Sequence, residues 1–324
     1  MHAEPSHTDL AQAAQWYACL RDGSASAADR AAWQRWLASA DAHAAAWRYV
    51  EDISRSFDPV RTLPNPRATA DQLATADQRL RTRRRILASL GILASGGGGG
   101  AMSWQQAWLP PEVMAWGADH RTATGEVRQL TLADGTLLWL NTASAVDIRF
   151  DAGERRIVLV TGEVFVETAR DSRPLRVYSP HGQMRALGTR FNVQMTAAGT
   201  QLAVYQGAVE VRTFATGTTR IVPTGQQTLF TTHAVAPLES GDAAREAWTQ
   251  GSFVADNLPL RLFVQELRRY RRGHLGLADS VADLAVYGNF PVHDTDRVLQ
   301  MLAATLPVRI EQPIAWWTTI EAQR

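Results

Sequence analysis

The stretch RTRRRILASLGILASGGGGGAMSWQQAW, residues 81–108, divides the chain into two parts. It opens with a cluster of arginines, Arg81, Arg83, Arg84 and Arg85. From Ile86 to Trp104 it contains no charged residue. A helix of about 20 apolar residues can cross the hydrocarbon core of a bilayer. Residues 79–108 are therefore predicted to form a basic flank followed by a transmembrane helix.

The charges and aromatic residues around this segment predict its orientation. Arginine is retained on the cytoplasmic side of a membrane, whereas Trp104 and Trp108 suit the opposite interface. The chain is therefore expected to cross a membrane once, with its N-terminus in the cytoplasm and its C-terminus on the opposite side. The string TRRRIL, residues 82–87, also resembles a twin-arginine export signal, so the export route stays open.

Five consecutive glycines, residues 96–100, interrupt the apolar segment with poor helix propensity. A buried, glycine-rich core helix is the alternative to a membrane span. A phosphate-binding loop is excluded, because no Gly-Lys-Ser/Thr sequence follows the glycines. In a membrane-spanning helix, the glycines would make a weak point at which an intramembrane protease could unwind it.

Composition limits the classes of function. The chain has 324 residues, a net charge of +1 and 45% apolar residues, as expected for two or three globular domains. Residues 1–78 carry seven arginines against ten acidic residues, which argues against direct binding of nucleic acid. Cys19 is the only cysteine, so no intramolecular disulfide or multi-cysteine zinc site can form. The histidines show no metal-binding spacing, and neither a metal nor a cofactor is expected.

The N-terminal part, residues 1–78, is predicted to be a small all-α module. Apolar residues at helical spacing indicate a first helix over Asp9 to Leu20. Ser26 and Asp29 form a capping-box pattern that starts a second helix. Asp41 can cap a third helix, whose apolar stripe is ended by Pro59 and the sequence Pro64-Asn65-Pro66.

Four of the eleven tryptophans fall within the first fifty residues of the chain, at Trp16, Trp33, Trp36 and Trp47. Tryptophan is enriched at the anchoring points of protein interfaces, so some of this aromatic surface is expected to bind a partner. The alternative is that the indoles form the core of a minimal bundle. A helix-turn-helix DNA reader is disfavoured by the acidic balance of the module.

These residues carry a resemblance to a known family. Trp16 and the string DRAAWQRWLASADAHAAAW, residues 29–47, resemble the cytoplasmic module of FecR-like anti-sigma regulators. The resemblance implies that this module binds an extracytoplasmic-function sigma factor. The implied sigma-binding residues are Trp16, Trp33, Trp36, Leu37, His43 and Trp47.

After a periplasmic linker, residues 109–120, short β runs between glycine turns predict an all-β domain over residues 121–237. Leu130 to Leu140 alternates around Ala-Asp-Gly, which is a hairpin signal. Gly-x-Val steps at Gly125, Gly162 and Gly207 suggest a stack of related β rungs. The strings TGEVRQLTLADGTLLWLNTASAV, TGEVFVETARDSRPLRV and MRALGTRFNVQ resemble the periplasmic FecR domain.

One step within this domain could carry chemistry. Gly188 and Thr189 place a hydroxyl next to a glycine carbonyl, as an N-to-O acyl shift requires. Some members of the resembled family cut themselves at such a bond. A glycine bulge in a strand is the alternative. His181 is the candidate base by proximity in the sequence.

Residues 245–316 read as strand, helix, strand, repeated once, which predicts an α+β domain of two βαβ units. NLPLRLFVQELRRY and YGNFPVHDTDRVLQMLAATLPVRI resemble the STN-type domain that ends these regulators. The arginines at the end of its first helix, Arg268, Arg269, Arg271 and Arg272, form either a solvated helix end or a contact with an acidic partner.

Taken as a whole, the resemblance implies a transmembrane anti-sigma factor and not an enzyme. Its periplasmic part would receive a signal from the signalling domain of a TonB-dependent outer-membrane transducer, typically in iron-siderophore uptake. Membrane and periplasmic proteases would then release the cytoplasmic module. Two alternatives remain, a self-cleaving envelope protein and a membrane-anchored DNA-binding regulator.

Overall fold

The computed structural model describes residues 5–21, 25–61 and 117–323. The chain divides into two compact units, Met1–Pro110 and Pro111–Arg324, and each is described on its own. No helix among the described residues is long and apolar enough to cross a membrane. The predicted membrane segment with its flank, residues 79–108, and the basic cluster Arg81, Arg83, Arg84 and Arg85 lie outside the described residues.

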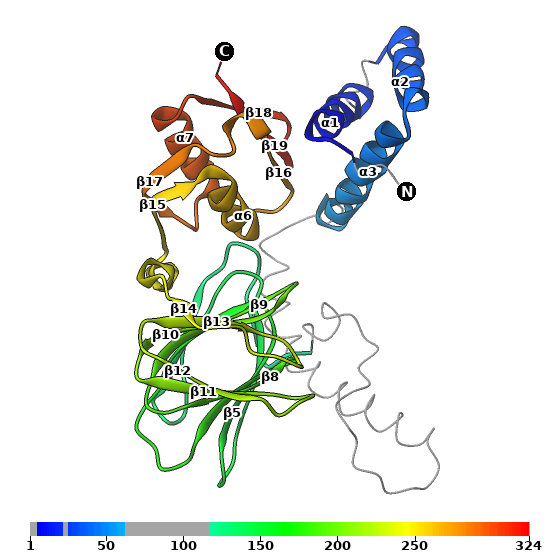
Figure 1. Ribbon diagram of the computed structural model, residues 1–324. Coiled ribbons are helices and arrows are strands. Elements are labelled where there is room, and N and C mark those ends of the chain that lie inside the picture. The colour runs from blue at the N-terminus through cyan, green and yellow to red at the C-terminus, as the bar shows by residue number, and fades with distance from the viewer. Residues whose placement is uncertain (1–4, 22–24, 62–116, 324) are drawn as a thin grey trace, which may run out of the picture. The chain divides into compact units, whose positions relative to one another are not determined.

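The first unit contains three helices, α1 (His7–Arg21), α2 (Ala27–Ser39) and α3 (Asp41–Arg61) (Figure 1). The predicted capping box is present. Ser26 Oγ accepts a hydrogen bond from the Asp29 backbone at 3.1 Å, and the Asp29 carboxylate accepts one from the Ser26 backbone at 2.9 Å. Ser6 and Asp9 repeat this arrangement, so α1 begins before Asp9.

Helix α3 continues past the first of the prolines that were expected to end it. It includes Pro59 and extends to Arg61, the last residue described in this unit. Small side chains bring α1 and α3 together, because Ala13, Ala14 and Ala46 are fully buried. A minimal bundle packed on alanines leaves Trp16, Trp33 and Trp47 at the margins of the core, where they are partly exposed.

The second unit starts with an all-β domain of fourteen strands. They are β1 (His120–Arg121), β2 (Arg128–Thr131), β3 (Leu137–Leu140), β4 (Ala145–Phe150), β5 (Arg155–Thr161), β6 (Glu163–Glu167), β7 (Leu175–Ser179), β8 (Gly182–Ala186), β9 (Arg190–Thr196), β10 (Gly199–Gln206), β11 (Ala208–Thr213), β12 (Thr219–Pro223), β13 (Gln226–Phe230) and β14 (Glu239–Ser240).

These strands form two seven-stranded sheets. One has the order β1-β4-β5-β7-β8-β11-β12 and the other the order β14-β13-β10-β9-β6-β3-β2. The two sheets face each other across a common interior (Figure 1), which apolar side chains of both fill. Successive strand pairs such as β4-β5, β7-β8 and β11-β12 join one sheet, while the strands between them join the other. The expected stack of rungs is therefore split over two sheets.

The predicted hairpin is confirmed. Strands β2 and β3 pair with Thr131 opposite Leu137, and Gly135 takes a left-handed φ of 84° in the turn. Asp134 of this turn forms a buried ion pair with Arg155 at 2.6 Å. Burial alone raises the pKa of Asp134, but hydrogen bonds from Thr136 and Arg155 outweigh it and lower the pKa.

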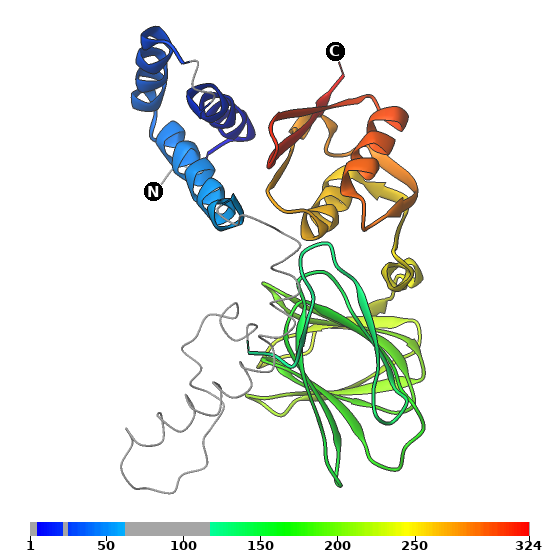
Figure 2. The ribbon, with the colours of Figure 1, turned by 180° about the vertical axis from the view of Figure 1, so that it is seen from behind.

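A short 3₁₀ helix, Ala243–Gln250, leads to the C-terminal α+β domain. This domain contains β15 (Ser252–Pro259), α6 (Leu260–Tyr270), β16 (His274–Leu277), a 3₁₀ turn (Asp279–Val281), β17 (Ala285–Pro291), α7 (Thr295–Thr305), β18 (Val308–Ile314) and β19 (Trp317–Ala322). Figure 2 shows α6 and α7 against the strands of the same domain.

Strand pairing in this domain differs from two βαβ units. Strand β15 pairs antiparallel with β17, whereas β16 joins a separate sheet of order β16-β19-β18. Strand β19, which lies beyond the expected end at residue 316, is the middle strand of that sheet. It pairs parallel with β16 and antiparallel with β18.

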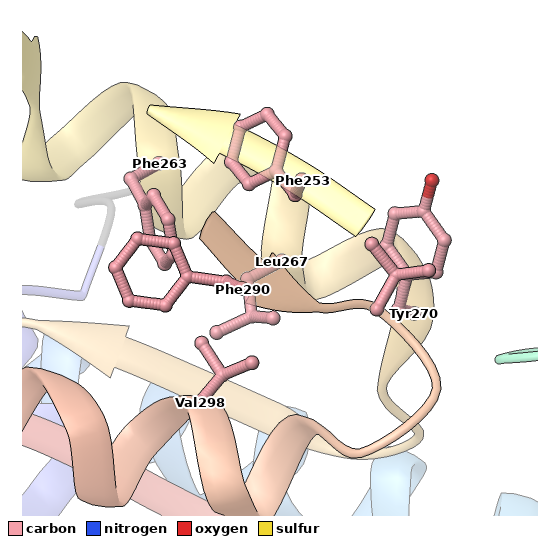
Figure 3. A pocket seen from close by; sticks show the side chains of 7 residues that line it. Phe253, Phe263, Leu267, Tyr270, Phe290 and Val298 are labelled. Carbon is pink, nitrogen blue, oxygen red and sulfur yellow. The ribbon is translucent and has the colours of Figure 1, made fainter. Parts of the chain in front are cut away.

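The core of the C-terminal domain is aromatic and closely packed. The ring of Phe263 lies tilted against Phe253, with centroids 5.1 Å apart, and edge-on to Phe290, with centroids 4.7 Å apart, beside Leu267 and Val298 (Figure 3). The hollow between these side chains has a volume of about 10 Å³. A water molecule needs roughly that much space and polar partners, so the hollow is a gap in packing and not a ligand site.

Candidate functional site

Aromatic side chains of the helical module gather between α2 and α3. The rings of Trp33 and Trp47 lie 4.9 Å apart, and Tyr17 of α1 lies 5.9 Å from Trp47. The three side chains are partly exposed. The indole N–H groups of Trp16 and Trp33 are buried and have no acceptor within the described helices. The packing of the three helices thus leaves part of these aromatic side chains exposed and two indole N–H groups without an acceptor.

Trp36 occupies a different position, because it belongs to the core. It is only 9% exposed and its indole N–H donates to Gln12 Oε1 at 2.8 Å. The ring stacks on His43 with centroids 4.6 Å apart and planes 11° from parallel. Trp36 therefore joins α2 to α1 and α3.

His43 serves the same junction. Its Nδ1 lies 2.9 Å from the Trp36 carbonyl oxygen, at the end of α2, and its Nε2 lies 3.3 Å from Asp9 of α1. Hydrogen bonds from Ser6 lower the pKa of Asp9, which favours the carboxylate. Both ring nitrogens of His43 are thus engaged within the module.

Five of the six proposed sigma-binding residues lie on α2 and α3. They fall into two groups, one partly exposed and the other holding the helices together. Trp33, Leu37 and Trp47 are partly exposed, and Trp16 of α1 is also partly exposed. Trp36 and His43 hold the helices together. An exposed aromatic residue that the sequence did not single out is Tyr49, at 45% exposure.

A second polar cluster lies in the other unit, around the carboxylate of Glu163. This residue opens β6 and is only 3% exposed. Its oxygens accept hydrogen bonds from the side-chain amides of Asn141 and Asn192, both at 2.8 Å. Arg269, at the end of α6 in the C-terminal domain, donates to it at 2.5 Å. A buried charge is therefore neutralised across two domains.

Further contacts fasten the end of α6 to the β domain. Thr142 Oγ1 donates to the Arg269 carbonyl oxygen at 2.9 Å. Burial alone lowers the pKa of the Arg269 guanidinium, but the carboxylates of Glu163 and Glu266 outweigh it and raise the pKa. Of the arginine cluster noted in the sequence, Arg269 thus meets an acidic partner within its own chain, as Arg271 does with Asp296.

Sequence reasoning did not single out Glu163. The signal available was a charged residue at the start of the otherwise apolar run Glu-Val-Phe-Val. Its partner Arg269 lies 106 residues further along the chain, so no local pattern could have joined the two.

The Gly188 and Thr189 step lies at an exposed corner before β9. Gly188 has a left-handed φ of 76°. Thr189 is 3% exposed and its Oγ1 is buried with no hydrogen-bond partner among the described residues. Its backbone pairs with Thr168, with N–H to Oγ1 at 2.8 Å. Gly207 packs so closely on the Gly188 carbonyl oxygen that a Cβ there would approach it to 2.4 Å.

His181, the candidate base, is engaged elsewhere. Its Nδ1 lies 2.8 Å from Thr200 Oγ1, and burial lowers its pKa. No group of His, Cys, Asp or Glu side chains in the described ranges is arranged to hold a metal ion.

Comparison with known families identifies two of the segments. Residues 118–210, which form most of the β domain, match the family model described as FecR protein. This match identifies most of the β domain as a FecR-type domain. Residues 11–53, which cover most of the three helices, match the model described as domain of unknown function DUF4880. The chain therefore contains a FecR-type segment and, before it, a DUF4880 segment, which confirms the resemblance found in the sequence.

Solved structures resemble part of the chain. Two crystal structures of a "putative anti-sigma factor" from Parabacteroides distasonis ATCC 8503 match with TM-scores of 0.52 and 0.51 at 22% identity. Each match covers 63% of this chain and nearly all of the other, 99% and 98%. At this identity the likeness establishes a shared fold. No curated protein matches the chain.

Proposed function

We propose that the chain is a transmembrane anti-sigma factor, anchored in the inner membrane through residues 79–108. Its cytoplasmic helical module, residues 1–78, binds an extracytoplasmic-function sigma factor. The observation that carries this proposal is the order of domains, in which the DUF4880 match and the FecR match flank the uncharged stretch of the sequence. The shared fold with the Parabacteroides anti-sigma candidate supports it.

The surface that we assign to the sigma factor is formed by Trp16, Trp33, Leu37 and Trp47. These side chains are partly exposed, and the buried indole N–H groups of Trp16 and Trp33 lack acceptors within the described helices. A partner that seats against them would bury more apolar area and could reposition the indoles toward acceptors of its own. Trp36 and His43 then act by holding the three helices in place.

Trp33→Ala should weaken the complex with the neighbouring sigma factor about 30-fold, as loss of an interface anchor worth roughly 2 kcal/mol does. The measurement is calorimetric titration of residues 1–78 with the sigma factor encoded beside the gene. Thermal melting of the same variant serves as control, because Trp33 is only partly buried. A folded wild-type module that binds no sigma factor would contradict the proposal.

The exported part would act as the receiver. The FecR domain and the C-terminal domain face the periplasm, where a TonB-dependent outer-membrane transducer would contact them. Proteolysis near the membrane, by membrane and periplasmic proteases, would then release the cytoplasmic module. The glycines at 96–100 would ease unwinding for such cleavage; substitution of all five by leucine should block induction while leaving insertion intact.

A second candidate activity is self-cleavage between Gly188 and Thr189. The buried Thr189 hydroxyl has no hydrogen-bond partner among the described residues, which suits a nucleophile. Attack of Oγ1 on the Gly188 carbonyl carbon would form an ester while the Gly188–Thr189 amide bond breaks. The hydroxyl proton would pass to the released Thr189 nitrogen, and water would then hydrolyse the ester.

Wild-type protein should separate into two fragments on a denaturing gel if this bond is cut, and Thr189→Ala should remain intact. His181→Ala is a matched control, because His181 binds Thr200 and should leave cleavage unchanged. A single intact band in wild type would remove self-cleavage without affecting the sigma-binding proposal.

A further inference from the structure

One face of the FecR domain carries arginines from four neighbouring strands in a single row. Arg149 of β4 lies opposite Arg156 of β5, Arg156 opposite Arg176 of β7, and Arg176 opposite Arg185 of β8. The alternate residues on these strands, such as Ile157, Val177 and Met184, are fully buried. The arginine row, defined as Arg149, Arg156, Arg176 and Arg185, therefore projects from the outer side of the sheet.

Such a row is electrostatically unfavourable by itself, because like charges directly opposite one another destabilise a sheet. Glu154 relieves the two inner arginines, pairing with Arg156 and with Arg176 at 2.8 Å. The two outer members, Arg149 and Arg185, are exposed and have no acidic partner among the described residues. Neither outer arginine forms an ion pair within the described residues, although Arg185 lies opposite Glu210 of β11. The two are about three strand spacings apart, roughly 14 Å.

The apolar side chains exposed on the β domain belong to the same face. Ile221, 55% exposed, continues the row beyond Glu210, which is opposite Arg185. Leu187, 48% exposed, follows Arg185 by two residues, and Phe214, 54% exposed, stacks beside Tyr178 of β7. Scattered exposed apolar residues are ordinary, but these three lie together toward the Arg185 end of one cationic row.

Five arginines and four acidic residues lie on or beside this side of the sheet. The acidic residues are Asp147, with Asp119 beside it, Glu154 and Glu210, and Arg212 on the outer side of β11 is the fifth arginine. Next to Arg185 lies a hollow of about 370 Å³ lined also by Arg170, Arg173 and Leu187. Asp171 and Arg173 in its wall pair with each other at 2.6 Å, which leaves Arg170 and Arg185 to face an incoming anion.

We propose that this face, defined by the arginine row with Leu187, Phe214 and Ile221, docks on an anionic phospholipid surface. Arginines near such a surface bind headgroup phosphates, and aromatic or aliphatic tips enter the interfacial layer between them. Nucleic acid or an acidic protein segment would use the cations but would leave the three apolar tips in water.

The proposal rests on the proposed membrane anchor, because the anchor keeps the FecR domain close to a bilayer. Twelve residues, 105–116, separate the uncharged stretch from the described domain, and a fully extended chain of that length reaches at most roughly 40 Å. An anchored chain therefore holds the FecR domain next to the bilayer, where even weak attraction of this face would orient it.

The test uses the full chain with Cys19→Ser, so that an introduced cysteine carries the only fluorescent label. Gln183→Cys places the label on the proposed face, and Gln129→Cys places it on the other sheet. The proteins are reconstituted in phosphatidylcholine vesicles with or without 30% phosphatidylglycerol, and headgroup nitroxide lipids quench labels near the surface. We expect quenching at position 183 that needs phosphatidylglycerol, and little at position 129.

Arg149→Gln with Arg185→Gln should lower the ratio of docked to undocked domains roughly 25-fold, at about fivefold for each arginine. The matched control, Arg272→Gln with Arg297→Gln, removes the same charge from exposed positions of the C-terminal domain and should leave the ratio unchanged. Equal quenching at both labels, or no effect of phosphatidylglycerol, overturns the proposal. Displacement by soluble polyglutamate would assign the face to an acidic protein instead.

Flotation of the full chain with vesicles tests the membrane anchor independently of the docking face. Full chain that does not float with pure phosphatidylcholine vesicles contradicts membrane anchoring, and flotation with phosphatidylglycerol vesicles then tests the face alone. Loss of this flotation in the Arg149 and Arg185 double variant supports the docking face even in that case, and its persistence contradicts it.

Discussion

Glu163→Ala should lower the free energy of unfolding of residues 117–324 by about 3 kcal/mol, at the low end of the cost of breaking a buried ion pair. The substitution leaves two amide donors, on Asn141 and Asn192, without their acceptor and deprives Arg269 of its most buried partner. Arg269 is 24% exposed and keeps its ion pair with Glu266 at 2.9 Å. These two features limit the decrease in the free energy of unfolding. Urea unfolding followed by tryptophan fluorescence measures the effect.

The matched control is Glu167→Ala in the same strand. Glu167 is 44% exposed and lies 3.4 Å from Arg190, so its removal should cost less than about 1 kcal/mol. Because Arg269 belongs to the other domain, Glu163→Ala should also make the 241–251 connection more sensitive to protease. Equal stability of the two variants would show that the buried carboxylate contributes no more than a surface one.

Trp36→Ala should unfold much of the helical module, because truncating a buried tryptophan costs about 3 kcal/mol or more. The indole joins three elements at once, through Gln12 of α1, the stack on His43 of α3 and its own helix α2. A module of three short helices has little stability to spare. Circular dichroism of residues 1–78 should show a large loss of helix at 25 °C.

Sigma binding by Trp36→Ala should fall in parallel with the folded fraction, in contrast to Trp33→Ala. Tyr49→Ala, at a 45% exposed position of α3, is the control for a change of aromatic content without loss of packing. If Trp36→Ala stays helical and still loses binding, Trp36 contacts the partner directly and its core role is secondary.

Local patterns predicted the elements whose signals lie within one segment. The first helix expected within residues 245–316 is present as α6, Leu260–Tyr270, because Pro259 precedes it and its buried residues recur at helical spacing. The capping box of Ser26 and Asp29 formed for the same reason. Each feature depends on residues a few positions apart.

Pairings between distant segments could not be predicted in this way. Alternation identified β strands but not their assignment to two sheets, which depends on partners such as β3 and β6. Strand β19 went unrecognised because it is stabilised by β16, more than 40 residues earlier in register. The same applies to the candidate site. Sequence spacing suggested that the four tryptophans have similar roles, and only their packing shows that Trp36 belongs to the core whereas Trp33 is partly exposed.

The middle position of β19 has a consequence for the order in which the C-terminal domain can fold. Strands β16 and β18 do not pair with each other and meet only through β19. Until residues 317–322 have been synthesised, β16 lacks its only partner in that sheet and β18 has none there. This sheet, unlike the β15–β17 pair, therefore cannot assemble strand by strand as the chain is made. It closes in one late step, and a chain shortened by a few residues before Ala322 would lose the whole three-stranded sheet.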